Sequence, residues 1–507
     1  MFDLFALPTE LVHNVIEAID DRPTLIALAQ TCQKLHPLAE AQLFKEIYIR
    51  DGTSVTRLAE ALEQRPKRIR AIEKLEATPF WHGWQGIEQM PELVGRMQRL
   101  KSLKVESPLI NSNRMDGWWS EGSAREYMDL FEVANGVPSA HLGRPTAAME
   151  GAFGCLTSFT LHSHGVNSRY YSFESILPIF LSTTLKFIHV SCVELGSCTT
   201  SDFRNRIRSR KGCTSLETLI LERCAAKAEG LQLVLSLPRA LRCLALLLSR
   251  NMDVERQGLE DLGGPIANKF VTNIIEALEQ QSGSLEHFRC TQARDSFRER
   301  QNTLQKILSL FGSSSATLRF NSPGLSVFGQ LRILELDYRS PVTAVVFDPK
   351  LSPPNLHTLG ISGIDYDFDR TWRHLPSYIS AIASATSFSH LRLHASPCPQ
   401  NFDDVFKTLE EPVFPEKAQR LRLLAVVESL RGRAGVELVS ACNWRGSVVP
   451  PYVYTEPVPE ERVIFDSRKR CSQEEADGYN PPFEMAPYVL TDGLGLKSFW
   501  CIGTKRF

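Results

Sequence analysis

The sequence has no apolar run long enough to cross a membrane. A spanning helix needs about 18 or more consecutive apolar residues, whereas the longest run here, 241–248, is interrupted by Arg242 and has the length of a strand. The first five residues carry an acid and no basic residue, so they do not have the form of a secretory signal. We therefore expect no membrane partner and a cytoplasmic or nuclear location.

The sequence also has no excess of charge of either sign. Lys and Arg total 57 and Asp and Glu total 58, so the net charge is -1, and we expect no nucleic-acid partner. The 12 cysteines are scattered along 507 residues and no Asn-x-Ser/Thr site occurs, which favours reduced thiols. Hydrophobic residues at 43% and charged residues at 23% are typical of a folded chain.

Catalytic and metal-binding motifs are missing as well. There is no phosphate-binding P-loop, no His-Glu-x-x-His motif and no Gly-x-Ser-x-Gly nucleophile elbow. His162 and His164 flank one serine, and Cys192 and Cys198 lie six apart, but neither pair makes a four-ligand zinc set. We therefore expect no catalytic residue, no metal and no cofactor, and a hydrolase or transferase is the weakest of the functions considered.

What is present begins with three short helical segments in residues 1–50. Residues 7–11 read Leu-Pro-Thr-Glu-Leu and open a first helix, in which Pro8 suits the first turn. Residues 20–23 predict a break, Thr24 is expected to cap a second helix, and a third begins near Pro37. Three short helices enclose a very small core, so such a unit usually needs a partner or a neighbouring domain.

This stretch resembles an F-box, which opens with Leu-Pro-x-Glu-Leu and continues with Leu-x-x-Leu-x-x-x-Cys-x-x-Leu, here at residues 25–35. The match covers about a tenth of the chain, and Leu43 and Phe44 stand where the commoner pattern has a tryptophan. The resemblance implies docking to the SKP adaptor of a cullin-type ubiquitin ligase. The residues implied in adaptor binding are Leu7, Pro8, Leu11, Ile16, Leu28 and Cys32. An ordinary N-terminal helical cap is the alternative.

Behind these helices, short strands are expected to alternate with helices. Residues 100–105 have the form Leu-x-x-Leu-x-Leu. Looser copies begin at Leu156, Leu185, Leu216, Leu241, Leu285, Leu331, Leu356, Phe388 and Leu421. Several neighbours lie 25 to 33 residues apart, as from Leu216 to Leu241 and from Phe388 to Leu421. Helices are expected in the intervals at 173–181, 231–237, 271–278, 304–311, 378–385 and 405–409.

The alternation resembles the irregular leucine-rich repeats that often follow an F-box. The resemblance implies an α/β fold in which a three-helix F-box at 1–50 precedes a repeat solenoid at 51–445, with a parallel sheet and with helices on its outer face. Residues 446–507 would form a C-terminal capping region. Because so loose a template matches on the order of tens of windows by chance, a globular α/β domain is the alternative.

In each expected strand, the residue between the last two apolar positions points away from the core. These residues are Lys104, Thr160, His189, Ile220, Ala245, Arg289, Glu335, Gly360, Arg392 and Ala425. Those expected to contact a target protein are Lys104, His189, Arg289, Glu335 and Arg392.

A dense basic run at 204–211 is either a solvated face between repeats or a site for an acidic or phosphorylated segment.

The predicted function is that of a non-catalytic substrate-recognition subunit of a cullin-type (SCF) ubiquitin ligase. It would bind the SKP-type adaptor, and through it a cullin, at one end and an unknown protein substrate along the repeats. The alternative is a leucine-rich-repeat scaffold for protein interactions that has no ubiquitin role.

Overall fold

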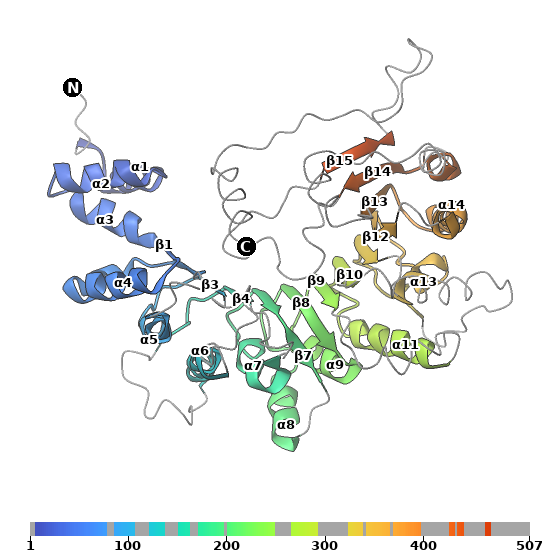
Figure 1. Cartoon of the computed structure of the whole chain (residues 1–507), viewed down its shortest axis with the longest axis horizontal. Helices are drawn as coiled ribbons and strands as arrows, with labels where there is room; N and C mark the ends of the chain where they lie inside the picture. The colour runs from blue at the N-terminus through green and yellow to red at the C-terminus, as the bar shows by residue number, and fades with distance from the viewer. Residues whose placement is uncertain are drawn as a thin grey trace, which may run out of the picture.

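A long sheet extends from residue 46 to residue 466 and curves through an arc. In the computed structural model, the strands line the inner side of the arc, the helices line its outer side, and the N-terminal helices project at one end (Figure 1). The structure describes residues 6–78, 86–106, 121–136, 151–162, 171–196, 200–248, 265–292, 323–337, 341–365, 369–396, 425–430, 433–440 and 462–467.

Within the described residues, fifteen strands belong to the sheet, and those on its main path follow one another in chain order. They are β1 (Glu46–Ile49), β2 (Lys74–Ala77), β3 (Ser102–Glu106), β4 (Ser158–His162), β6 (Phe187–Ser191), β8 (Thr218–Ala226), β9 (Cys243–Leu248), β10 (His287–Gln292), β11 (Ile333–Asp337), β12 (Thr358–Asp365), β13 (His390–Ser396), β14 (Gly435–Ser440) and β15 (Arg462–Asp466). Pairing is parallel from β1 to β14, and β15 pairs antiparallel with β14. Short strands β5 (Tyr171–Ser172) and β7 (Val193–Leu195) pair beside β8. The fold is therefore α/β with a long, mainly parallel sheet, and it is consistent with a solenoid-like arrangement.

Helices occupy the intervals between most strands. They are α4 (Gly52–Gln64), η2 (Pro66–Arg70), η3 (Ile87–Gln89), α5 (Met90–Gly95), α6 (Glu121–Ala134), α7 (Phe173–Phe180), α8 (Ser201–Ser209), α9 (Ala228–Ser236), α11 (Pro265–Glu279), α13 (Pro341–Phe347) and α14 (Asp369–Ala385). The helices predicted at 173–181, 231–237, 271–278 and 378–385 are confirmed as α7, α9, α11 and part of α14. Those predicted at 304–311 and 405–409 lie outside the described residues. Among the described residues, no helix is both long and apolar enough to traverse a bilayer.

The leucine pattern supplies the apolar rows that hold the strands to the helices. Leu103, Phe159 and Ile188 are buried and stand side by side in the register of β3, β4 and β6. The first apolar residue of the pattern is buried too, as at Leu100 and Leu156. Burial of one such side chain contributes about 1.5–3 kcal/mol. The strands predicted from 100–105 to 388–393 are confirmed, because each unit buries its apolar face against its neighbours.

The three N-terminal helices have an apolar core of their own. They are α1 (Thr9–Glu17), α2 (Arg22–Thr31) and α3 (His36–Lys45). Their buried residues are Val12, Ile16, Leu25, Leu35 and Ala39. This cluster is separate from the one that extends beneath the sheet. The chain therefore begins with a small helical unit that does not share the main core.

The start of α2 differs from the prediction in its cap. Asp21, not Thr24, is the N-cap residue, and its side chain accepts a hydrogen bond from the backbone N–H of Thr24 at 2.9 Å. Pro23 lies in the first turn, where its missing N–H leaves no hydrogen bond unmade. The predicted break at 20–23 is therefore shorter than expected.

The far end of the sheet corrects one predicted strand. Residues 421–424 lie outside the described residues, and Val426 belongs to a helical turn at 425–430. The strand beside β13 is β14, in which Val436 and Leu438 are buried. Three places before Val436 stands Arg433, which is not apolar, so the leucine pattern missed this strand. The inner-face residue of the strand is Glu437, not Ala425.

Candidate binding surfaces

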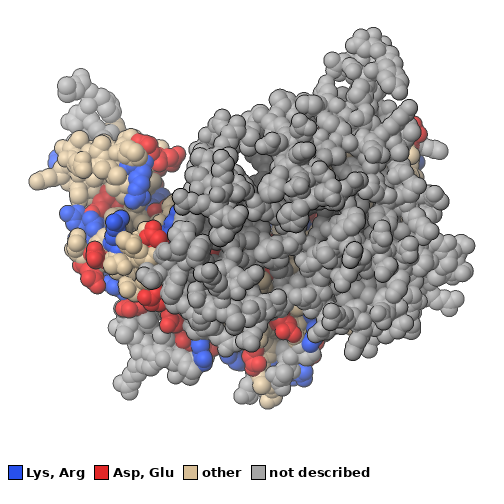
Figure 2. All heavy atoms as spheres, viewed as in Figure 1, with Lys and Arg blue, Asp and Glu red and all other residues tan. Residues whose placement is uncertain are grey.

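The N-terminal helices carry large apolar side chains on their surface. Leu11 is 46% exposed, Val15 is 43% exposed and Ile26 is 42% exposed. Leu11 and Val15 lie one turn apart on α1 and therefore share one side of that helix. Figure 2 shows mostly uncharged surface over these helices. Exposed apolar side chains that share one face, as Leu11 and Val15 do, are typical of surfaces that bind another protein.

The residues implied in adaptor binding divide by burial. Pro8 and Leu11 are exposed, whereas Leu7, Leu28 and Cys32 are half-buried.

Ile16 is only 2% exposed and belongs to the core of the three helices. Ile16 can therefore affect a bound partner only indirectly, by packing the three helices together. Val15 and Ile26, which are not among the residues implied in adaptor binding, are exposed.

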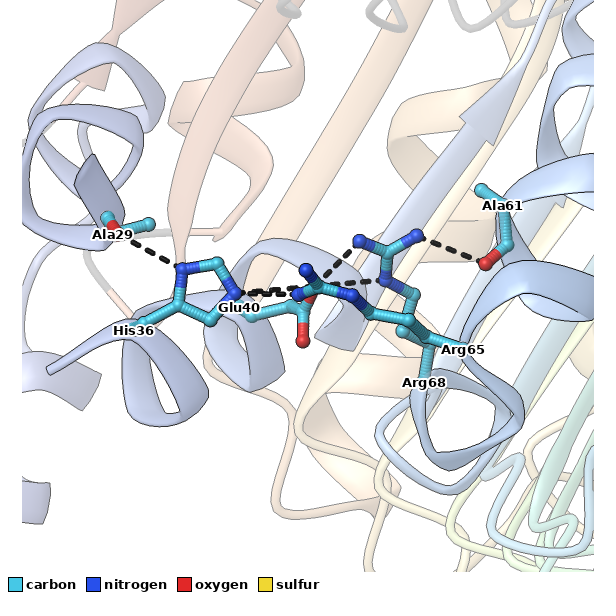
Figure 3. Close-up of polar contacts among 6 residues, drawn as sticks. All are labelled: Ala29, His36, Glu40, Ala61, Arg65 and Arg68. Carbon is cyan, nitrogen blue, oxygen red and sulfur yellow. Dashed lines mark hydrogen bonds and ion pairs between the residues drawn. The ribbon is translucent and has the colours of Figure 1, made fainter. Parts of the chain in front are cut away.

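A charged clamp joins the N-terminal helices to the first units of the sheet. Glu40 on α3 accepts hydrogen bonds at its Oε1 from Arg65 Nη1 and from Arg68 Nε, each at 2.8 Å (Figure 3). The Arg68 guanidinium also donates to the Ala61 carbonyl of α4 at 2.9 Å and lies over the ring of Phe44 at 4.8 Å. These contacts cross from the small core to the large one and fix the angle between the two.

The hydrogen bonds of His36 and the lowered pKa of Glu40 also stabilise this clamp. His36 Nδ1 donates to the Ala29 carbonyl at 2.9 Å, which leaves Nε2 to accept from Arg65 (Figure 3). Burial acts to raise the pKa of Glu40, but the hydrogen bonds and charges of Arg68 and Arg65 outweigh it and hold the pKa below its ordinary value. The carboxylate is therefore ionised over the physiological range of pH.

The predicted inner row of the sheet is one continuous row in the register. Strand pairing places the following residues side by side, from β1 to β14: Tyr48, Glu76, Lys104, Thr160, His189, Ile220, Ala245, Arg289, Glu335, Gly360, Arg392 and Glu437. All five predicted target-binding residues lie in this row, and Arg289 and Glu335 are in direct contact at 3.4 Å. The row belongs to the inner side of the arc (Figure 1).

One polar arrangement occurs twice along the row. His287 and Arg289 of β10 both reach Glu335 of β11, at 3.3 and 3.4 Å. In the same way, His390 and Arg392 of β13 both reach the Glu437 carboxylate of β14, at 3.1 and 3.3 Å. His287 and His390 occupy equivalent positions in the register.

The first of these carboxylates has a strongly shifted pKa. Burial acts to raise the pKa of Glu335, but the contact with His287 and the charge of Arg289 outweigh it and lower the pKa to about 2. The Arg289 contact at 3.4 Å is an ion pair, and neither it nor the His287 contact at 3.3 Å has the geometry of a good hydrogen bond. The polar side chains of the inner face therefore contact one another, and the arginines among them remain half-exposed.

A second polar group lies nearer the N-terminal end of the sheet. Lys104 Nζ is 2.8 Å from Glu106, whose Oε1 is 3.1 Å from His162 Nδ1. His162 Nε2 is 3.3 Å from His189 Nδ1, and His189 Nε2 is 3.0 Å from Glu222 Oε2. Burial lowers the pKa of His162 despite the hydrogen bond to Glu106.

This group includes three residues that lie outside the predicted row. Glu106, His162 and Glu222 come from β3, β4 and β8, and they lie one inner-face position beyond the predicted row. The alternation of the strand sequence could have identified these residues, since every second residue of a strand faces the same side. His162 was noted only with His164, which lies outside the described residues.

The basic run at 204–211 lies mainly on α8 and is partly engaged within the chain. Arg204 Nη2 is 2.6 Å from Glu229, and Arg206 Nη2 is 3.2 Å from Glu132. These ion pairs favour a structural, solvated helix face over a site for phosphorylated segments.

Comparison with known proteins gives no relative for this chain: no protein-family model matches it, and no curated protein matches it.

Proposed function

We propose that the protein is a non-catalytic substrate-recognition subunit of a cullin-type (SCF) ubiquitin ligase, with an F-box at its N-terminus and degenerate leucine-rich repeats behind it. In this proposal, α1 and α2 dock to a SKP-type adaptor that connects to a cullin, and the inner row of the sheet binds a target protein. The role is consistent with a cytoplasmic or nuclear protein.

The N-terminal unit is the observation that carries the proposal. Its three helices have a core separate from that of the sheet, yet they leave Leu11, Val15 and Ile26 exposed. A mere cap for the first strand would be expected to direct its apolar side chains toward the sheet. Helices that keep a small core and expose an apolar face are suited to an outside partner.

The mechanism is proximity. The clamp around Glu40 ties the helices to the sheet, so an adaptor and a target bound to the same chain stay in a defined relation. Holding two partners together raises their effective concentration without any catalytic group on this chain. The half-exposed Arg289 and Arg392, each beside a glutamate side chain, offer polar contacts to the target.

Binding of a purified SKP-type adaptor tests the proposal. The full chain is compared with a double variant, Leu11→Asp with Val15→Asp, which places charges on the exposed side of α1. Truncating an interface anchor typically costs about 1–4 kcal/mol, so we expect affinity to fall by at least about tenfold. Circular dichroism checks that the helices remain folded.

Val327→Asp is the matched control, because Val327 is an equally exposed valine, at 44%, far from these helices in the chain. Equal affinity of the double variant and the wild type contradicts the proposal. Absence of any adaptor binding by the wild type also contradicts it and favours a repeat scaffold without a ubiquitin role.

A further inference from the structure

Three neighbouring strands bring His162, His189 and Glu222 together on the inner side of the sheet. Each residue offers one ligand atom, and these atoms all lie within 4.8 Å of one another. The residues are 27 and 33 positions apart in sequence, so only the pairing of β4, β6 and β8 assembles them. We propose that this group binds one divalent transition-metal ion, and Zn²⁺ is the probe ion that suits its ligands.

The donor atoms suit such an ion. Imidazole nitrogen and carboxylate oxygen are preferred ligands of Zn²⁺, at about 2.0–2.2 Å. Two ligands on a tetrahedral ion with such bonds are about 3.3 Å apart. His162 Nε2 and His189 Nδ1 stand 3.3 Å apart, which is the separation that one shared ion requires. Glu222 Oε2 lies 3.0 Å from the other nitrogen of His189, Nε2, and would become the third ligand by turning its side chain toward the ion.

The surroundings orient the first of these rings. Glu106 takes the Nδ1 side of His162 at 3.1 Å and is itself held by Lys104 at 2.8 Å. A carboxylate on one ring nitrogen fixes the tautomer and directs the lone pair of the other nitrogen to a metal. His162 is 3% exposed and Glu106 is 1% exposed, so both side chains are held in place by packing.

Three protein ligands leave one position of a tetrahedral ion open. In zinc proteins of this ligand number, a water or an anionic group of a partner fills that position. The ion would thus lie beside the inner row with one position left for such a group. The proposal does not depend on adaptor docking, and each of the two can fail alone.

Metal titration of the full-length, metal-free protein tests the inference. We expect one Zn²⁺ per chain by calorimetry, and Co²⁺ should give a visible ligand-field absorption that Zn²⁺ displaces. The melting temperature should rise with Zn²⁺, because an ion that binds only the folded state stabilises it. A wild-type protein that gives no Co²⁺ absorption overturns the inference.

Variants locate the ion. His189→Ala and Glu222→Gln should lose the Co²⁺ absorption, and Glu106→Gln should weaken binding by about 10- to 100-fold through the orientation of His162. His357→Ala is the control, because His357 is an exposed histidine outside the group and its loss should leave binding unchanged. If His189→Ala does not fold, Glu222→Gln alone tests the assignment of the ligands, because it preserves the shape of the side chain. Undiminished Co²⁺ absorption in folded Glu222→Gln, or equal loss in His357→Ala, overturns the assignment.

Discussion

Glu40 on α3 receives the Nε hydrogen of Arg68 at 2.8 Å, and this pair connects two parts of the chain whose apolar cores are separate. Both side chains are largely shielded, with 19% of Glu40 and 17% of Arg68 exposed. An ion pair in such a setting is costly to break, because the remaining partner keeps an uncompensated charge away from water. The pair therefore determines how firmly the N-terminal helices are attached to the sheet.

The first prediction concerns this clamp. Glu40→Gln should lower the free energy of unfolding of the N-terminal helices by about 1–3 kcal/mol, because it weakens hydrogen bonds to two arginines. Limited proteolysis should show faster cleavage near the junction, at 45–52. Glu286→Gln is the control, since the Arg242–Glu286 pair at 2.9 Å is more exposed and such pairs contribute at most about 1 kcal/mol. Equal losses of stability in the two variants would show that the clamp contributes no more than an exposed ion pair.

The second prediction separates packing from docking on α1. Ile16→Ala should destabilise the N-terminal helices by about 2–4 kcal/mol, because the side chain is 2% exposed and its loss leaves a cavity. Val15→Ala, one residue away and 43% exposed, should change stability by less than about 0.5 kcal/mol. Chemical denaturation followed by circular dichroism measures both. Comparable destabilisation by the two variants would contradict the assignment of the inward and outward faces of α1.

The third prediction concerns the packing of α9 against β7. A Cβ on Gly230 would lie 2.6 Å from the Leu195 carbonyl oxygen, and backbone atoms cannot move aside cheaply. Gly230→Ala should therefore lower the free energy of unfolding by at least about 1–3 kcal/mol. Gly283→Ala is the matched control, because a Cβ there meets no atom within 4 Å. Thermal melts compare the two, and a neutral Gly230→Ala would show that α9 is less closely packed than described.

The fourth prediction is a pH dependence at Glu335. Its pKa in the folded protein is about 2, below the ordinary value of 4.5, so its contribution to stability is present above about pH 5 and is lost as the pH falls toward 2. At neutral pH, Glu335→Gln should cost about 1–3 kcal/mol, and the difference from the wild type should shrink on acidification. Urea unfolding at several pH values measures this difference.

The control for the fourth prediction is Glu217→Gln. Glu217 forms a more exposed ion pair with Lys186 at 3.3 Å, and such pairs contribute little. Its unfolding should follow the wild type at every pH. A Glu335→Gln penalty that does not depend on pH would contradict the shifted pKa.

Sequence spacing predicted most of the strands because the pattern and the packing have the same cause. The apolar residues that define a copy, such as Leu100 and Leu103, are the ones that the sheet buries. The pattern failed at β14, where Arg433 stands in place of the first apolar residue, although Val436 and Leu438 are buried and the strand pairs with β13 and β15.

Side-chain placement was harder to predict than the strands. Ile16 and Val15 are adjacent apolar residues, and only the packing of the three helices decides which faces inward. His162, His189 and Glu222 come from three strands, and the lengths of the intervening segments conceal their contact. Linear spacing therefore identified the inner row and missed the group of residues beside it.

Hydrogen–deuterium exchange of the full chain, with and without a purified SKP-type adaptor, tests the central claim most directly. The account predicts slower exchange on adaptor binding in α1 and α2, around Leu11, Val15 and Ile26, and unchanged exchange along strands β3 to β14. Protection confined to the sheet, or no protection anywhere, would contradict the assignment of the N-terminal helices as the docking unit.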